Sequence, residues 1–160
     1  GVPGADMAAV ISRYILKNGR MVRFRLGQHQ GTLLTSKHEN SVAYDTNLRY
    51  IRSLERECSV LVIVDAVSRK YFTGETSWLW DIDFDQLSCP HVRRVWLCGK
   101  YVNDLAMRFD YTSVPAERIV LEPDIAQAAR RLAAQGGVDL YVVTCFSDRD
   151  KLLEHTQAEA

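Results

Sequence analysis

From residue 59 onward, apolar residues gather into short runs that are rich in β-branched side chains. Four such runs, at residues 59–66, 94–99, 118–123 and 139–146, have the length and composition of β-strands. The first and last are almost continuously apolar, which is typical of strands buried on both faces of a sheet. The pattern therefore predicts four strands, at least two of them central.

Segments with helical spacing separate these runs. The expected helices cover residues 43–56, 101–111 and 124–137, and a last helix begins with Ser147 as its N-cap. Within residues 101–111 the apolar side chains of Val102, Leu105, Ala106 and Phe109 share one face. Alternation of strands with helices predicts an α/β domain with a mostly parallel sheet.

The N-terminal part has a different pattern. Residues 5–19 carry a helical apolar stripe that stops at Asn18-Gly19, and residues 21–26 and 31–36 then form two strand-like runs around a short turn at 27–30. The predicted fold class is α/β: a mostly parallel, Rossmann-like sheet flanked by helices, preceded by a short helix and a β-hairpin.

The balance of charged residues argues against binding to nucleic acid or membrane through bulk charge. Twenty Lys and Arg residues balance 20 Asp and Glu residues, so the formal net charge is zero and nothing favours bulk attraction to nucleic acid or anionic membrane. The basic clusters Arg20/Arg23/Arg25 and Arg93/Arg94 lie beside expected strands, which indicates solvated faces. No segment has the roughly 18 apolar residues that a membrane span requires.

Cysteine and histidine spacing does not support a metal centre. The four cysteines contain no CxxC pair, and no histidines have HExxH spacing, so we expect neither a metal site nor an internal Ser/His/Asp triad. Cysteines inside apolar runs behave as small hydrophobic residues. We therefore expect reduced thiols and a cytoplasmic location.

The stretch 75-ETSWLWDIDF-84 is the strongest candidate for chemistry. It follows a strand–loop segment, so Glu75 is expected at the carboxyl edge of the sheet, where α/β proteins bind ligands. A carboxylate there can act as a base or orient a histidine, or it can cap the short helix that contains Trp78 and Trp80. The tryptophans are candidates for core anchors or for partner docking. Asp81, Asp83 and Asp85 alternate with apolar residues, and their spacing is that of a solvated strip.

A second candidate is Gly99, which separates a predicted strand from a helix. Such a junction can present free backbone N–H groups to a phosphate. A single glycine without a GxGxxG pattern favours a tight turn instead, and the chain contains no P-loop motif.

Two segments resemble the Mur ligase family. Residues 1–21, GVPGADMAAVISRYILKNGRM, are similar to the end of a Mur ligase central domain and its hinge. The remainder resembles the C-terminal domain of MurT-like members, most specifically in 75-ETSWLWDIDF-84 and 99-GKYVNDLAMRFDY-111. The resemblance implies a domain division of 1–20, the tail of the central domain with the hinge, and 21–160, the C-terminal domain.

The resemblance also implies an activity. MurT-like subunits use ATP and Mg²⁺ to amidate the D-glutamate of a lipid II-type peptidoglycan stem peptide, with ammonia from a GatD-like class I glutaminase. Glu75 stands where the family has the aspartate assigned to the partner's Cys–His pair. Lys37, Asp81, Asp83 and Gly99 are expected near nucleotide or substrate, and Trp78 and Trp80 at the partner. The isolated domain is not expected to bind cofactor or to be active.

The sequence departs from the family at loops. After Lys37, the family's Asn-Pro-Ala-Gly is replaced by 38-HENS-41, and Phe72-Thr73 replaces an Asp-Gly pair. Two alternative functions stay open: the C-terminal domain of a Mur-type ligase that adds an amino acid to a UDP-MurNAc-peptide, and a non-catalytic module that docks a partner through Trp78, Trp80 and the Asp81/Asp83/Asp85 strip.

Overall fold

The computed structural model describes residues 20–37, 40–66 and 75–158. The predicted helix at 5–19 and most of the proposed 1–20 segment lie outside the described residues. In the described part, a seven-stranded sheet has the order β5-β4-β3-β6-β2-β1-β7. Its strands are β1 (Met21–Leu26), β2 (His29–Ser36), β3 (Cys58–Ile63), β4 (Val92–Cys98), β5 (Ile119–Glu122), β6 (Asp139–Cys145) and β7 (Gln157–Ala158).

The predicted fold class is confirmed. Strands β2 to β6 pair in parallel, whereas β1 pairs antiparallel with β2 in the predicted hairpin. A short strand, β7, which the sequence pattern did not predict, pairs antiparallel with β1 and forms the edge of the sheet. Among the described residues, four α-helices flank the sheet: α2 (Ser41–Arg52), α3 (Val102–Phe109), α4 (Ile125–Ala133) and α5 (Phe146–Leu153).

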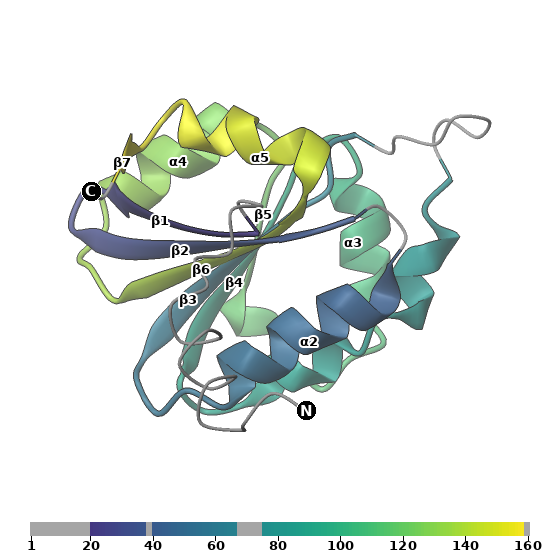
Figure 1. Ribbon diagram of the computed structural model, residues 1–160. Helices are drawn as coiled ribbons and strands as arrows, with labels where there is room; N and C mark the ends of the chain where they lie inside the picture. The colour runs from purple at the N-terminus through teal and green to yellow at the C-terminus, as the bar shows by residue number, and fades with distance from the viewer. Residues whose placement is uncertain (1–19, 38–39, 67–74, 159–160) are drawn as a thin grey trace, which may run out of the picture.

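The helices divide between the two faces of the sheet (Figure 1). Helices α4 and α5 lie on one face, and α2 and α3 lie on the other together with the 3-10 helices η1 (Ser77–Asp81) and η2 (Phe84–Ser88). A third 3-10 helix, η3 (Ala116–Arg118), leads into β5. Every residue of β3 is buried, and its side chains alternate between two hydrophobic clusters, one on each face. The sheet is therefore the middle layer of three, as continuously apolar strands require.

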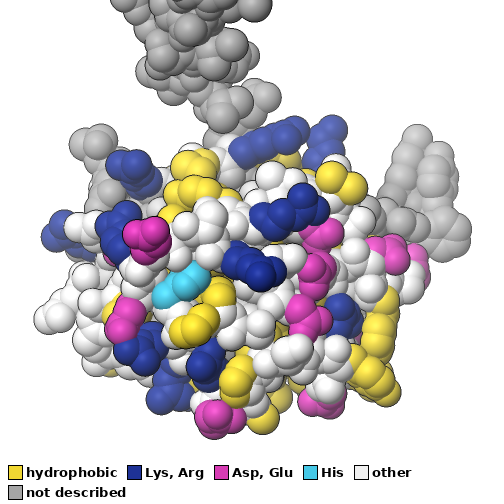
Figure 2. Space-filling model, turned by 90° about the horizontal axis from the view of Figure 1, so that it is seen from below, with side chains coloured by type: hydrophobic (Ala, Val, Ile, Leu, Met, Phe, Trp, Pro, Cys, Tyr) yellow, Lys and Arg dark blue, Asp and Glu magenta, His cyan; other side chains and the backbone are white. Residues whose placement is uncertain are grey.

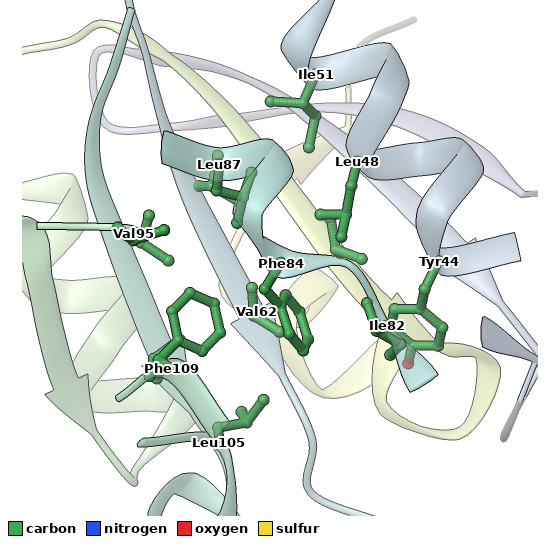
Figure 3. Packing of buried hydrophobic residues seen from close by; sticks show 14 of the residues in the cluster. Tyr44, Leu48, Ile51, Val62, Ile82, Phe84, Leu87, Val95, Leu105 and Phe109 are labelled. Atoms are coloured by element: carbon green, nitrogen blue, oxygen red, sulfur yellow. The ribbon is translucent and has the colours of Figure 1, made fainter. Parts of the chain in front are cut away.

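The larger core cluster holds the 3-10 segments in place. Phe84 is fully buried, and its ring centroid lies 4.7 Å from that of Phe109 on α3. Figure 3 shows the two rings side by side, with Leu48 and Tyr44 of α2 on the far side of Phe84. The segment after Glu75 is thus anchored to two helices by apolar packing.

The last helix begins differently from the expectation. Ser147 was predicted as its N-cap, and this was wrong, because α5 starts at Phe146 with Cys145 as N-cap and without a side-chain capping bond. The Ser147 hydroxyl lies 3.2 Å from the Cys145 sulfur instead. The carboxylate in the first turn of this helix belongs to Asp148.

Candidate functional site

The carboxyl ends of the parallel strands meet at one edge of the sheet. At this edge lie Lys37 after β2, Val64-Asp65 after β3, Gly99 after β4 and the start of α5 after β6. This is the place where parallel α/β sheets position functional residues. Lys37 is exposed there, as expected for a side chain that would contact a ligand.

Gly99 makes a tight turn at this edge. Its φ is +99°, and a Cβ added to it would lie 2.5 Å from the carbonyl oxygen of Val64. Only glycine fits both the backbone conformation and the close approach. The N–H groups at the turn are all used: Gly99 donates to Pro123, Lys100 to Asp65, and Tyr101 to Val64. The tight-turn interpretation accounts for this geometry, since no N–H of these three residues is left for a phosphate.

A buried carboxylate, which sequence analysis missed, organises the neighbouring strand end. Asp148 has no exposed surface, and its oxygens accept the backbone N–H groups of Asp65 at 2.9 Å and Ala66 at 3.0 Å. They also accept Lys151 Nζ at 3.0 Å and the Cys145 thiol at 3.2 Å. A buried charge needs such partners to offset its lost hydration. Helix α5 is therefore tied to the segment that leaves β3.

Asp65 extends this network to β4. Its carboxylate accepts Lys151 Nζ at 2.5 Å and the backbone N–H of Lys100 at 2.8 Å. Partial burial acts to raise the pKa of Asp65, but the hydrogen bonds and positive charges of Lys151 and Lys100 outweigh it and hold that pKa below its usual value. Burial likewise acts to lower the pKa of Lys151, whereas Asp65 and Asp148 raise it. Both side chains are thus ionised near neutral pH.

Glu75 lies at the start of η1. Its Oε1 accepts the Ser77 backbone N–H at 3.1 Å and also the Ser77 hydroxyl in a very short contact. The adjacent Thr76 hydroxyl donates to Asp104 of α3 at 2.8 Å. Glu75 thus accepts the first backbone N–H of η1, in keeping with the capping interpretation, and the bond of Thr76 holds this segment next to α3.

The two tryptophans have different surroundings. Trp78 is 5% exposed and packs in the core, with its ring centroid 5.3 Å from that of Tyr44. Trp80 is 50% exposed, lies edge-on to the exposed Tyr111 at 5.3 Å, and has the Arg108 guanidinium 5.6 Å from its ring centroid. Of the two predicted docking residues, Trp80 is the one with its ring at the surface.

The strip formed by Asp81, Asp83 and Asp85 runs from the end of η1 into η2, and part of it forms hydrogen bonds within the domain. Asp81 and Asp83 are exposed, and the Asp83 backbone N–H donates to Asp45 of α2 at 2.9 Å. Asp85 accepts the Ser113 N–H at 2.6 Å, and hydrogen bonds from Ser113 lower its pKa. Its carboxylate therefore fastens a loop in addition to facing solvent.

The structure brings some expected residues together and separates others. Gly99 and Lys37 follow strands that end at the carboxyl edge, and Glu75 precedes η1, whereas Trp80 lies within η1 near α3 and Asp83 lies after η1 near α2. Within the described ranges, no cluster of three or more His, Cys, Asp or Glu side chains is arranged to hold a metal ion. No helix among those residues is long and apolar enough to cross a membrane.

The missed network had a weak signal in the sequence. Asp65 directly follows an apolar run, and Asp148 and Lys151 stand three residues apart just after another one. Each feature alone is common. Only the parallel pairing of β3 with β6 places the three side chains at one point.

Comparison with known proteins assigns the family. The model of the family described as MurT ligase C-terminal matches residues 38–148, more than half of the chain. The chain belongs to the MurT ligase C-terminal family. A curated relative, the lipid II isoglutaminyl synthase (glutamine-hydrolyzing) subunit MurT of Streptococcus pneumoniae (strain ATCC BAA-255 / R6), is 26% identical over 130 residues. The alignment covers 81% of this chain but only 28% of the relative, so the chain spans just over a quarter of that protein's length.

The resemblance expected from the sequence is confirmed at the level of the family. The match to the MurT ligase C-terminal family includes Glu75, the tight turn at Gly99, Asp65 and Asp148, and it begins one residue after Lys37. The ends of β3, β4 and β6 at the carboxyl edge of this MurT C-terminal domain are therefore inside the region that matches the family, whereas β2 and Lys37 precede it.

Proposed function

We propose that residues 21–160 form the C-terminal domain of a MurT-like subunit of a glutamine-hydrolysing ligase, and that residues 1–20 are the tail of a Mur ligase central domain with its hinge. The reaction would be ATP-dependent amidation of the D-glutamate in a lipid II-type stem peptide. The observation that supports this most directly is the family match over residues 38–148, together with the name of the relative that aligns with 81% of the chain.

In this proposal Glu75 acts across a subunit interface. Its carboxylate accepts the imidazole N–H of a histidine in a GatD-like class I glutaminase and so fixes the tautomer that activates the partner's cysteine. The bond from Ser77 is compatible with this role, because a carboxylate has two oxygens and about four acceptor positions. The cap would then serve to orient the Glu75 side chain.

The exposed aromatic surface next to η1 fits the same assignment. Trp80 and Tyr111 present an edge-to-face pair at the surface, supported from behind by Arg108, whose guanidinium donates to the Ile82 carbonyl at 2.8 Å. Tryptophan, tyrosine and arginine are the side chains that most often anchor protein interfaces. In the proposal this surface contacts the glutaminase, beside Glu75.

Nucleotide would be held mainly by the rest of the protein. At the carboxyl edge of this domain the backbone N–H groups of the Gly99 turn are already used, so the groups that fit a phosphate are the exposed side chains of Lys37 and Lys100. ATP supplies the activation of the substrate carboxylate, and these lysines would offset phosphate charge as the domain closes over the nucleotide.

The test uses the full-length parent protein with its glutaminase. Glutamine hydrolysis is compared among wild type, Glu75→Ala and Glu75→Asp, and complex formation is measured for each. We expect a loss of at least about 100-fold for Glu75→Ala, with Glu75→Asp retaining most activity and all three forming the complex. Equal activity of wild type and Glu75→Ala within an intact complex would reject the catalytic role.

A docking module without catalysis is the second candidate, because Glu75 caps η1 and Trp80 is exposed. It predicts that Trp80→Ala abolishes the complex while Glu75→Ala changes nothing. Absence of any complex with the glutaminase would instead favour a Mur-type ligase that adds an amino acid.

A further inference from the structure

A polar pocket lies at the opposite end of the sheet from Glu75. Its volume is about 250 Å³. It lies where β1, β2 and the start of β6 meet the C-terminal part of α2 and the loop after it. The residues that line it are Arg23, Gln30, Gly31, Thr32, Tyr50, Arg56, Asp139 and Tyr141. Strand β6 continues from Tyr141 in the pocket to Cys145 at the carboxyl edge, a span of roughly 13 Å at the rise of a β-strand. It is therefore distinct from the candidate site described above.

The floor of the pocket is a row of side chains across three strands. Arg23 of β1 pairs with Thr32 of β2, which pairs with Tyr141 of β6, so the three side chains project from the same face of the sheet. The row continues into the core at Val60 of β3. Helix α2 covers the sheet as far as Tyr141, whereas Thr32 is partly exposed and Arg23 is exposed.

Tyr141 is the buried polar residue of the pocket and distinguishes it from an ordinary solvated strand surface. It is only 5% exposed, and its remaining exposed surface faces the pocket that it lines. Burial raises the pKa of its hydroxyl, with further contributions from Tyr50 and Asp139, so it stays a hydrogen-bond donor at any physiological pH. Tyr50 stands edge-on to it, with ring centroids 6.1 Å apart, and closes one side of the pocket.

The charges of the lining favour an anion. Arg56 pairs with Asp139 at 3.4 Å, which leaves the positive charge of Arg23 without a counter-charge among the pocket's residues. No hydrogen bond to protein engages the side chains of Arg23, Thr32 or Tyr141 within the part of the chain that the structure describes. Guanidinium and hydroxyl donors that converge on one space suit the oxygens of a phosphate or carboxylate.

On the face seen in Figure 2, Lys and Arg side chains alternate with acidic and hydrophobic ones, in keeping with the zero net charge. The pocket is concave, and the side chains of Arg23, Thr32 and Tyr141 are among those that line it. Its size is just below the 300 to 1,000 Å³ range of drug-sized ligand sites, which limits the occupant to a small group.

We infer that this pocket binds an oxyanion, namely a phosphate or carboxylate group of a small molecule, held by Arg23, Arg56, Thr32 and Tyr141. Arg23 and Arg56 contribute charge, Thr32 and Tyr141 contribute hydroxyl donors, and Asp139 weakens the site by competing for Arg56. This site goes beyond the proposed amidation function and does not depend on it.

The test is a titration of the ¹⁵N-labelled 160-residue chain with inorganic phosphate, pyrophosphate and acetate, followed by NMR at constant ionic strength. We expect saturable shifts at Thr32 and Tyr141, and the preference among the three probes tells a phosphate-bearing from a carboxylate ligand. Arg23→Gln should weaken binding about tenfold, as loss of a charged hydrogen bond predicts. Tyr141→Phe, which keeps the ring, should weaken it several-fold.

Two variants serve as controls. Arg25→Gln removes an exposed arginine from the same face of β1 outside the pocket, and it should leave binding unchanged. Asp139→Asn removes the competing carboxylate and should strengthen binding. Equal losses for Arg23→Gln and Arg25→Gln, or shifts that never saturate, would show only diffuse charge attraction and overturn the inference.

Discussion

The buried carboxylate of Asp148 yields the most direct prediction of stability. Replacing it by alanine removes the acceptor for two backbone N–H groups, those of Asp65 and Ala66, and leaves Lys151 with Asp65 alone. Each N–H left without a partner costs about 1–3 kcal/mol when buried. Because both residues are half-buried and water reaches them in part, we expect Asp148→Ala to lower the free energy of unfolding by about 2–4 kcal/mol.

The asparagine variant tests the same reasoning more finely. Asp148→Asn keeps the shape and one acceptor oxygen, but its amide NH₂ faces groups that are themselves donors, so it should still cost about 1–3 kcal/mol. Urea unfolding at pH 7, analysed by linear extrapolation, measures both values. Asp150→Asn is the matched control, since this carboxylate lies on the same helix, is 70% exposed and should change stability by less than about 0.5 kcal/mol.

Hydrogen exchange of the backbone amides shows whether the loss of stability comes from the hydrogen bonds that Asp148 accepts. In Asp148→Ala the amides of Asp65 and Ala66 should exchange faster relative to the rest of β3. A loss of less than about 1 kcal/mol for Asp148→Ala, similar to that of Asp150→Asn, would refute the role of this carboxylate in holding the carboxyl edge together.

Three further predictions concern other parts of the fold. Gly99→Ala should lower stability by more than about 2 kcal/mol, because an L-residue is strained at φ +99° and its Cβ would meet the Val64 carbonyl; Gly136→Ala, with open space around it, is the control in the same urea assay. Phe84→Ala should cost about 3–5 kcal/mol by opening a cavity in the larger core cluster, and a cost below about 1 kcal/mol would show that the 3-10 segment is not part of the core. The pKa of Asp65 is lower in the folded chain than in the unfolded chain. The stabilisation that the ionised carboxylate gives to the fold is therefore complete above its unfolded pKa of about 4, and it is lost as the pH falls through its pKa in the folded chain. Asp65→Asn should therefore flatten the fall in thermal stability between about pH 5 and pH 2, and an unchanged acid profile would argue against the charge network.

Local patterns were enough to predict most of the secondary structure. The continuously apolar runs correctly marked β3 and β6, and helical spacing placed Val102, Leu105 and Phe109 on the inner face of α3. These predictions succeed because burial on one or both faces of an element imposes a period on its own sequence. The family resemblance likewise depended on contiguous motifs, and the match over residues 38–148 confirmed it.

Strand order and long-range polar contacts could not be obtained in this way. Nothing local shows that β6 lies between β3 and β2, or that β7 would pair with β1. Ser147 has the chemistry of an N-cap, but its helix starts one residue earlier, and the neighbouring Asp148 is directed to a strand end 83 residues away in sequence.

The candidate site residues likewise divide into those that a local pattern predicts and those that only long-range contacts bring together. The sequence by itself predicted that Glu75, Lys37 and Gly99 lie near the carboxyl edge, because a strand followed by a loop or glycine is a local feature. Only the tertiary structure decided that Asp65, Asp148 and Lys151 form one network and that Arg23 and Tyr141 share a pocket. Hydrogen bonds and charge pairs act over a few ångströms of space without regard to distance along the chain, so they leave no periodic trace in the sequence.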